Sequence, residues 1–323
     1  MKRRLFLSGS AAATLGLVGC GGGGGGGPAG ATDVVTGGVL TSTTGLGGAA
    51  ASPAGPSSLP AKVLGCYYTA FATGGYRISD IPADFNVIYL FHAKPNGNPV
   101  GGSWNNVGDG SFKFEHYDEV PASDVQACRA RGQMVILTVG GASAGYNFNT
   151  REKSQNFVAS FQDMYNRLGG VDGCDFNNFE ANIGSSPAEM VWISQQLKAL
   201  YGAGFAITAP PQPNSAEDRA MIKAMGDAGV LDWAGPQYYD WSGFNAPGFI
   251  SNRTNDWVGD LGSDKVILGL SANYGNGPSL SDCIREWDAV RIAHPNIRGM
   301  FCWSAQHNLN GGNVWGSTMK GLL

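Results

Sequence analysis

Residues 170–180 read Gly-Val-Asp-Gly-Cys-Asp-Phe-Asn-Asn-Phe-Glu, and this stretch decides the fold. Small and apolar residues lead into a cluster of acids and amides, as at the C-terminal end of a buried strand. That end of a strand is where an α/β barrel carries its chemistry. A helix N-terminus also collects Asp and Asn, and it is the alternative interpretation. The surrounding sequence favours the strand.

Apolar runs of strand length alternate with helical patterns along residues 61–323. The opening stretch supplies the fourth strand, and the other seven runs lie at 63–68, 87–91, 134–139, 205–208, 235–239, 266–270 and 299–303. Helical patterns lie at about 119–132, 151–168, 187–202, 216–228, 249–260 and 280–293, and Thr150 and Ser186 are placed to start two of them. Continuously apolar runs suit strands that are buried on both faces. We predict an α/β fold, a single-domain (β/α)8 TIM barrel, with a doubly wound open sheet as the alternative.

Residues 1–19 have the pattern of an export signal. Lys2-Arg3-Arg4 precede an apolar run that is too short to span a membrane, and Arg3–Leu7 is similar to the twin-arginine export motif. Leu17–Cys20 resembles a bacterial lipobox, which implies cleavage before Cys20 and lipidation of its sulfur. The alternative is an ordinary signal peptide with a chance cysteine. We expect an exported protein of the bacterial cell envelope that contacts a membrane only through the lipid at Cys20.

Residues 20–60 are predicted to be a flexible tether between this signal and the barrel at 61–323. The first 60 residues contain 17 of the 50 glycines, and Ser, Thr, Ala and Pro make up most of the remainder after Cys20. A segment of this composition cannot bury enough apolar area to offset the entropy of ordering it.

Charge and cysteine content narrow the expected partners. Without the three basic residues of the signal, the chain has 18 basic and 25 acidic side chains, a formal charge of −7, and no basic cluster that would favour nucleic acid. No CxxC or HExxH spacing occurs, so we expect no metal and no cofactor. We expect a monomer with a neutral partner.

Five cysteines follow Cys20: Cys66, Cys128, Cys174, Cys283 and Cys302. An odd number of cysteines in apolar contexts is a poor disulfide framework and fits buried free thiols.

Polar and aromatic residues follow the ends of the predicted strands. Aromatic faces stack on the C–H surfaces of sugars, and amides and carboxylates fix hydroxyl groups. The composition therefore predicts a carbohydrate site, whereas core packing is preferred for Trp192 and Trp287, which lie on predicted helices. The polar and aromatic residues are Gln212 after the fifth strand, Gln237, Tyr239 and Asp240 at the end of the sixth, and Trp303 at the end of the eighth. Gly140 and Gly141 after the third strand would let a ligand or the backbone approach closely.

Several of these segments, in this order, resemble glycoside hydrolase family 18, the chitinases and endo-β-N-acetylglucosaminidases. The resemblance implies a (β/α)8 barrel that cleaves β-1,4-linked N-acetylglucosamine polymers. It covers the length of the barrel, although the central DGxDxDxE motif is imperfect in this chain. The matching segments are Ile81–Ile88, Thr138–Gly141, 172–180, Gln237–Asp240, Ile267–Ala272 and Trp303.

The resemblance also implies a retaining, substrate-assisted mechanism, one of the exceptions to the scheme with two catalytic carboxylates. The last motif Glu protonates the leaving oxygen while the substrate's own acetamide attacks the anomeric carbon. The middle motif Asp holds the acetamide N–H, the sixth-strand Tyr239 supports the acetamide oxygen, and Trp303 forms the floor of the sugar subsite. Tyr67 and the strand-end residues Gly140, Gly141, Gln212, Gln237 and Asp240 are the implied substrate-binding residues, and Gln212 replaces an acid that is common in the family.

The register of the motif leaves two interpretations open. Gapless alignment gives Asn177 and Phe179 the places of the middle Asp and the catalytic Glu. A bulge at Asn177 or Asn178 would instead bring Asp175, Asn178 and Glu180 to one face, because side chains alternate along a regular strand. We favour the bulge, since an ionised Glu180 aimed into the barrel wall would be costly. The catalytic residues are then expected to be Glu180, Asn178, Asp175 and Tyr239.

Three hypotheses for the function follow from the motif and from the length of the loops. An amide in place of the middle Asp loses a charge-assisted contact of roughly 1.5–3 kcal/mol, which predicts turnover slower by about 10- to 10²-fold. Residues 271–298 leave no room for an extra α+β domain, which suggests an open cleft and endo-acting cleavage. The leading hypothesis is a lipid-anchored chitinase-like hydrolase. A non-catalytic glycan-binding lipoprotein is the alternative, and an endoglycosidase of peptidoglycan or N-glycans is the third.

Overall fold

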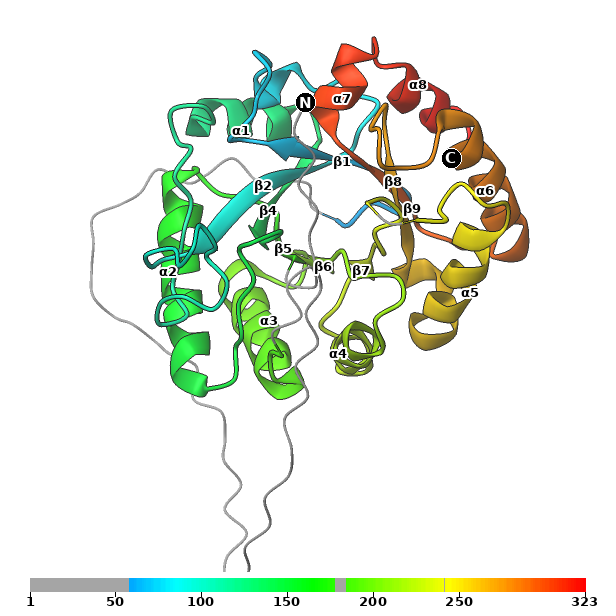
Figure 1. Cartoon of the computed structure of the whole chain (residues 1–323). Helices are drawn as coiled ribbons and strands as arrows, with labels where there is room; N and C mark the ends of the chain where they lie inside the picture. Colours follow the sequence, from blue (N-terminus) through cyan, green and yellow to red (C-terminus); the bar gives the residue numbers. More distant parts are fainter. Residues whose placement is uncertain (1–57, 178–183, 241) are drawn as a thin grey trace, which may run out of the picture. The chain divides into compact units, whose positions relative to one another are not determined.

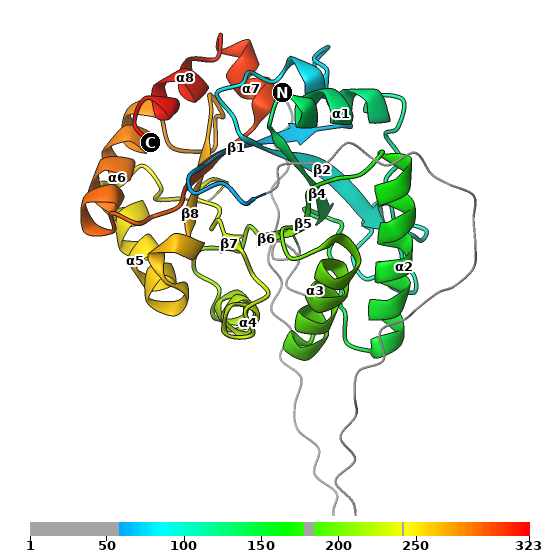
Figure 2. The same ribbon diagram turned by 180° about the vertical axis from the view of Figure 1, so that it is seen from behind.

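In the part of the chain that the structure describes, eight parallel strands form the barrel. Helices surround these strands (Figures 1 and 2). The computed structural model describes residues 58–177, 184–240 and 242–323. Its strands are β1 Val63–Thr69, β2 Val87–Pro95, β3 Phe112–Lys113, β4 Met134–Gly140, β5 Gly173–Asn177, β6 Ala206–Ala209, β7 Trp233–Ala234, β8 Ile267–Ser271 and β9 Gly299–Trp303. Its helices are α1 Ala122–Ala130, α2 Arg151–Arg167, α3 Pro187–Tyr201, α4 Ala216–Asp227, α5 Phe249–Leu261, α6 Leu280–Ala293, α7 Ala305–Asn310 and α8 Val314–Lys320, with short 3-10 turns η1 Ile78–Asp80 and η2 Ser263–Lys265.

The strand pairing closes the sheet into a barrel. The order along the sheet is β7-β6-β5-β4-β2-β1-β9-β8, so β1 pairs with both β2 and β9. Parallel bridges from Ala234 to Val266 and from Gln237 to Gly269 then join the β7 segment to β8. The predicted (β/α)8 barrel is confirmed, and the open-sheet alternative is wrong.

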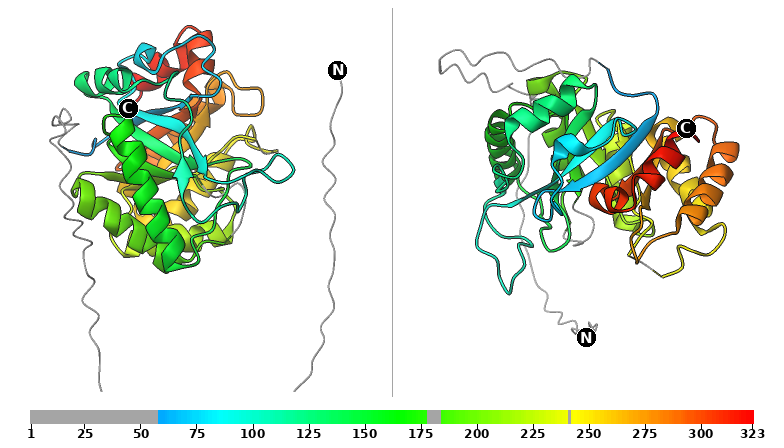
Figure 3. Two further views of the ribbon diagram at one scale, coloured as in Figure 1. Left: turned by 90° about the vertical axis from the view of Figure 1, so that its left-hand side faces the viewer. Right: turned by 90° about the horizontal axis from the view of Figure 1, so that it is seen from above.

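Local signals in the sequence explain where several elements begin and end. The side chain of Thr150 accepts a hydrogen bond from the Lys153 backbone N–H at the start of α2. Ser186 precedes α3, which has Pro187 in its first turn, where a missing N–H costs nothing. The short β3, which pairs antiparallel with β2, was not predicted, and the connection between these two strands reaches out from the barrel (Figure 3).

The sixth barrel strand differs from its prediction. It was expected at 235–239, but the regular ladder covers Trp233–Ala234. Pro236 has no N–H to donate, so the ladder is interrupted there. The chain beyond it stays alongside β8 through two isolated hydrogen bonds, from Gly269 N–H to the Pro236 carbonyl at 3.0 Å and from Tyr238 N–H to the Gly269 carbonyl at 2.8 Å.

Aromatic side chains fill the interior of the barrel. Tyr67 and Tyr89 stack with ring centroids 4.6 Å apart, and Phe301 packs edge-on against both rings. Glycine makes room for these rings, because a Cβ on Gly269 would lie 2.5 Å from the Phe301 ring and a Cβ on Gly65 would lie 2.8 Å from Tyr89. The interior is therefore a packed core rather than a channel.

A second apolar core lies between the strands and the helices. Trp287 is buried there, as predicted, and Trp192 is partly buried against the same core with the Arg151 guanidinium 4.2 Å from its ring centroid. The five cysteines from Cys66 to Cys302 are buried and form no disulfide. Within the described ranges, no helix has the length and apolar character needed to cross a membrane. The connection from β8 to β9 contains one helix, α6, and no inserted domain.

Candidate active site

Asp175 lies inside the barrel on β5, where hydroxyl groups from three other strands surround its carboxylate. Tyr67 Oη of β1 and Thr138 Oγ1 of β4 donate to Asp175 Oδ2 at 2.7 and 3.0 Å. Thr208 Oγ1 of β6 donates to Asp175 Oδ1 at 2.6 Å. Asp175 is 1% exposed, and none of the ion pairs found among the described residues includes it. Neutral hydrogen bonds hold this carboxylate.

The protonation of this cluster follows from its burial. Burial raises the pKa of Asp175 to about 6, although the hydrogen bonds from Thr208, Tyr67 and Thr138 each act to lower it. Burial, with the charge of Asp175, also raises the pKa of the Tyr67 phenol well above its usual range, so Tyr67 stays a donor. The carboxylate is mainly ionised at neutral pH and takes up a proton in mild acid. A buried carboxylate of this kind is suited to stabilising positive charge on a ligand.

Asn177 is the next β5 residue on the face that carries Asp175, because side chains alternate along a strand. The ladder between β4 and β5 is unbroken from the Ile136–Gly173 pair to the Gly140–Asn177 pair. Asn177 is 2% exposed, and its side-chain oxygen has no hydrogen-bond partner among the described residues. A buried amide oxygen is costly without a donor, and a bound ligand could supply one.

The glycines at the end of β4 bring its backbone close to β5. Gly140 and Gly141 have φ values of 87° and 114°, a region that favours glycine. A Cβ on Gly140 would lie 2.4 Å from the Asn177 carbonyl oxygen, which accepts a hydrogen bond from Gly141 N–H at 2.5 Å. The close contact between the ends of β4 and β5 thus requires these two glycines, and it fixes the position of Asn177 along the barrel axis.

Tyr239 and Trp303 form an aromatic wall above the carboxylate. Their rings stack with centroids 6.2 Å apart and 21° between the planes. Trp303 is partly exposed and also packs against Tyr67, with centroids 5.7 Å apart. Since Tyr67 donates to Asp175, these contacts bring the predicted residues of β1, β5, the β7 segment and β9 together at the C-terminal ends of the strands.

The remaining predicted rim residues have different surroundings. Gln237 is buried, and its side-chain N–H donates to the Pro210 carbonyl at 2.6 Å, so it joins two loops. Gln212 is partly buried, and its backbone N–H donates to Asp218 Oδ2 at 3.1 Å. Asp240 is exposed at the rim, where its Oδ1 accepts a hydrogen bond from Tyr274 Oη at 2.7 Å. Gln237 has a structural role, and Asp240 faces solvent.

Three of the predicted functional residues lie outside the described residues: Glu180 and Asn178 at the end of the motif, and Cys20 at the lipobox. The regular pairing of Asn177 with Gly140 means that no bulge occurs in the described part of β5. A bulge at Asn178 stays a prediction.

Two residues of the cluster were given no role from the sequence: Thr208, and Thr138, which was noted only as the first residue of the matching segment Thr138–Gly141. Thr138 and Thr208 donate directly to Asp175, but in the sequence they look like β-branched filler within apolar strands. Their positions could have indicated this role, because both lie directly beside Asp175 on the two strands that flank β5. Among the described residues, no group of three His, Cys, Asp or Glu side chains lies close enough together to hold a metal ion.

The chain is similar in sequence to fungal endochitinases. No family model matches the chain. The chain is 24% identical over 291 residues to endochitinase 4 of the fungus Metarhizium robertsii, an alignment that covers 77% of this chain and 79% of the relative. It is 26% identical over 220 residues to endochitinase 3 of the same fungus, covering 58% of this chain and 65% of that relative.

Solved structures share the fold. A family GH18 chitinase from Chromobacterium violaceum matches with a TM-score of 0.65 at 19% identity, covering 82% of this chain and 84% of that chain. The xylanase and α-amylase inhibitor protein XAIP-II from Scadoxus multiflorus matches with a TM-score of 0.64 at 16% identity, covering 80% and 98%. The same barrel thus serves as a hydrolase in one neighbour and as an inhibitor in another, so the fold alone does not decide the activity.

Proposed function

The chain belongs with glycoside hydrolase family 18, and from this premise we propose that it is a chitinase-like hydrolase of β-1,4-linked N-acetylglucosamine polymers. One observation carries the proposal: the ionisable carboxylate of Asp175 is buried below the stacked rings of Tyr239 and Trp303 at the mouth of the barrel. The rings offer apolar faces to a pyranose, and the carboxylate offers negative charge to a cationic intermediate. The names of the fungal relatives support the same substrate class.

The proposed chemistry is substrate-assisted and retaining. Glu180 is the general acid that gives its proton to the leaving glycosidic oxygen, while the substrate's acetamide oxygen attacks the anomeric carbon. An amide of the motif, Asn178 or Asn177, accepts the acetamide N–H. The side-chain oxygen of Asn177, which has no hydrogen-bond partner among the described residues, supports that role. Tyr239 supports the acetamide oxygen. Asp175 stabilises the cationic intermediate from below. The connection from β8 to β9 contains α6 and no inserted domain, and the open cleft that this implies favours endo-acting cleavage.

Hydrolysis of a fluorogenic N-acetylchitooligosaccharide tests the proposal. The wild type should release the fluorophore, and Glu180→Gln should be slower by about 10²- to 10⁴-fold, which is the usual contribution of a general acid. Glu152→Gln, on the exposed surface of α2, is the matched control and should keep full activity.

The second candidate is a non-catalytic glycan-binding protein on the same barrel. The inhibitor XAIP-II as a structural neighbour and the amide in place of the motif Asp favour it. If wild type and Glu180→Gln are both inactive yet bind the chitooligosaccharide, this candidate replaces the hydrolase. Action on peptidoglycan or N-glycans would appear as turnover of those substrates in preference to chitooligosaccharide.

We also propose export and lipid anchoring at Cys20, which rest on the sequence of residues 1–20. The curated relatives reported above are fungal, so they do not bear on a bacterial lipobox. Expression in a bacterial host gives the test: the wild type should fractionate with membranes, and Cys20→Ala should not. Recovery of both proteins in the soluble fraction would refute the anchor.

A further inference from the structure

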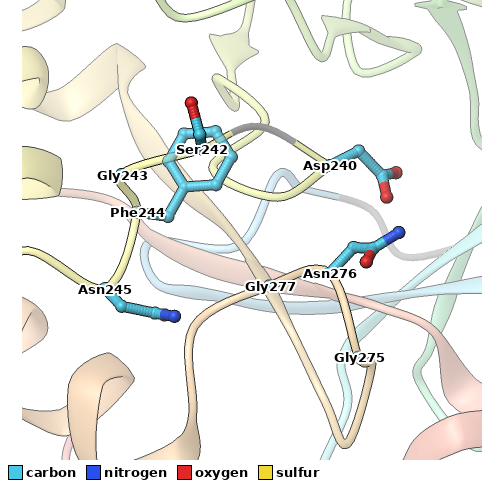
Figure 4. Close-up of a pocket in the computed structure, with 8 residues that line it drawn as sticks. All are labelled: Asp240, Ser242, Gly243, Phe244, Asn245, Gly275, Asn276 and Gly277. Carbon is cyan, nitrogen blue, oxygen red and sulfur yellow. The ribbon is translucent and has the colours of Figure 1, made fainter.

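A hollow lies at the rim of the barrel, between the loop that follows β7 and the loop that follows β8. Its volume is about 370 Å³. In Figure 4 the segment Ser242–Asn245 forms one wall and Gly275–Gly277 forms the other. The described residues that line it are Asp240, Ser242, Gly243, Phe244, Asn245, Gly275, Asn276 and Gly277.

Hydrogen bonds join Asp240 to the loop that contains Gly275–Gly277. Asp240 N–H donates to the Asn276 carbonyl at 2.6 Å, and Tyr274 Oη donates to Asp240 Oδ1 at 2.7 Å. Gly277 packs so closely that a Cβ there would lie 2.0 Å from Ser271 Oγ and 3.2 Å from Tyr239 Cβ. These contacts hold Asp240 and the Gly275–Gly277 wall in place, which lowers the entropic cost of binding a ligand on this side of the hollow. It is also adjacent to Tyr239, so one extended ligand can reach both the mouth and the hollow.

The charge of the hollow has one sign. Asp240 is the ionisable residue among those that line it, and no Lys, Arg or His is among them. Asp240 is exposed, and none of the ion pairs among the described residues involves it. The other polar groups are a hydroxyl and two amides, from Ser242, Asn245 and Asn276. This combination suits a ligand that has several hydroxyl groups and one positive charge.

We propose that this hollow is a second sugar subsite that binds a glucosamine unit with a free, protonated amine better than an N-acetylated unit. The proposal rests on the proposed function, because an N-acetylglucosamine unit bound beside Tyr239 and Trp303 brings the rest of the polymer to the rim. The ammonium lies against the Asp240 carboxylate, and the sugar hydroxyls bond to Asn276 and Asn245. An acetamide at the same place has no charge for Asp240 to meet. The preferred substrate is then a partly deacetylated chitin-like polymer.

Titration calorimetry with defined tetramers tests the subsite. The ligands are the fully N-acetylated tetramer and the two tetramers that have one glucosamine at either end, and the background variant Glu180→Gln prevents their cleavage. One of the end-deacetylated tetramers should bind about three- to fivefold more tightly than the fully acetylated one, the size expected of an exposed charge pair. The preference should decrease as salt is added, because exposed charges are screened.

Substitution of Asp240 identifies the source of the preference. Asp240→Asn should abolish it and still fold, because Asp240 has φ 64° and Asn tolerates that conformation. Asp264→Asn, an exposed carboxylate on η2, is the control of equal charge and should keep it. Asn245→Asp should increase it.

The outcomes separate the two proposals. If no tetramer binds, the proposed function fails. If the acetylated tetramer binds and neither end-deacetylated tetramer gains affinity, the amine subsite is wrong and the proposed function stands. The amine subsite is equally wrong if the gain in affinity persists in Asp240→Asn.

Discussion

Asp172 and Asp175 are three residues apart in one motif, yet they serve opposite ends of the barrel. Asp172, just before β5, pairs with Arg129 Nε at 3.1 Å and accepts a hydrogen bond from Val135 N–H at 2.9 Å. Asp175 receives hydroxyl groups from three strands and no cation. Burial raises the pKa of both carboxyls, so burial does not distinguish them. Their partners distinguish them. The Arg129 guanidinium neutralises the negative charge of Asp172, whereas the negative charge of Asp175 has no cationic partner among the described residues and can interact with a ligand.

The surroundings of the two carboxylates differ in the same way. Around the N-terminal ends of the strands, charged side chains join neighbouring segments: Lys198 pairs with Asp232 at 2.8 Å, and Lys62 donates to the Ile297 carbonyl at 2.5 Å. At the C-terminal ends, Asn177 has a side-chain oxygen without a partner among the described residues, and Trp303 is partly exposed. One end of the barrel is therefore built for stability and the other for binding, as expected of this architecture.

The largest effect is expected from Asp172→Ala. The substitution leaves the Arg129 guanidinium buried without its partner, and it leaves Val135 N–H without an acceptor. Loss of one member of a buried pair costs about 3–5 kcal/mol in the free energy of unfolding. Urea denaturation monitored by circular dichroism measures it.

The exposed pair of Lys223 and Asp227 on α4 supplies the control. Asp227→Ala should cost less than about 1 kcal/mol, because surface pairs contribute little. Activity per folded molecule should be unchanged in both variants. Equal stability losses in the two would contradict a scaffold role for Asp172.

Asp175→Asn should act on turnover. Loss of the buried negative charge below the mouth is expected to reduce kcat by about 10²-fold, or about 3 kcal/mol of transition-state stabilisation.

The same substitution should increase the free energy of unfolding at neutral pH, whereas Asp172→Ala decreases it. The folded pKa of Asp175 is about 6 and the ordinary value is 3.8, so the folded protein binds this proton more readily than the unfolded chain. The wild type therefore loses stability as pH rises from about 4 to 6, by about 3 kcal/mol from this group, and the loss persists above pH 6.

Asp175→Asn has no such titration. Its stability relative to the wild type should rise between pH 4 and pH 7, and denaturation in urea at both pH values measures the change. An identical pH dependence in the two proteins would mean that Asp175 does not titrate in this range.

The barrel and most of its site residues were predicted from the sequence, whereas the different roles of Asp172 and Asp175 were not. The barrel was predictable because each strand is an apolar run that ends in polar residues. The sixth strand was misplaced because Pro236 interrupts a run that otherwise reads as continuous. Thr138 and Thr208 were overlooked because a threonine in an apolar strand gives no sign of which carboxylate it will meet.

The register of the motif after Asn177 stays a prediction. A shift of one residue moves every following side chain to the opposite face of a strand, and composition does not reveal such a shift. The close approach of Gly140 to the Asn177 carbonyl fixes the height of β5 at that point, and it involves residues 37 positions apart in the chain. Contacts at that separation cannot be inferred from local patterns.

The smallest effect is expected from Tyr67→Phe, which removes one of the three hydroxyl donors and keeps the ring that stacks on Tyr89 and packs against Trp303. Hydrogen bonds to the charged form lower the pKa of a carboxyl, so their loss raises it. The pKa of Asp175 should rise by about one unit, the equivalent of one hydrogen bond of roughly 1.4 kcal/mol. The acidic limb of the pH–kcat/KM profile, which reports the free enzyme, should move upward by the same amount.

Tyr89→Phe is the matched control for this shift. The Tyr89 hydroxyl accepts a hydrogen bond from Trp233 Nε1 at 2.8 Å and is not a donor to Asp175. This variant should lose some stability, because the indole N–H is left buried without an acceptor, but its acidic limb should stay in place. If the limb moves equally in both tyrosine variants, the shift reflects general loosening of the aromatic core. If it moves in neither, the group that titrates in the limb is not Asp175, and the assignment of chemistry to this end of β5 has to rest on the residues after Asn177.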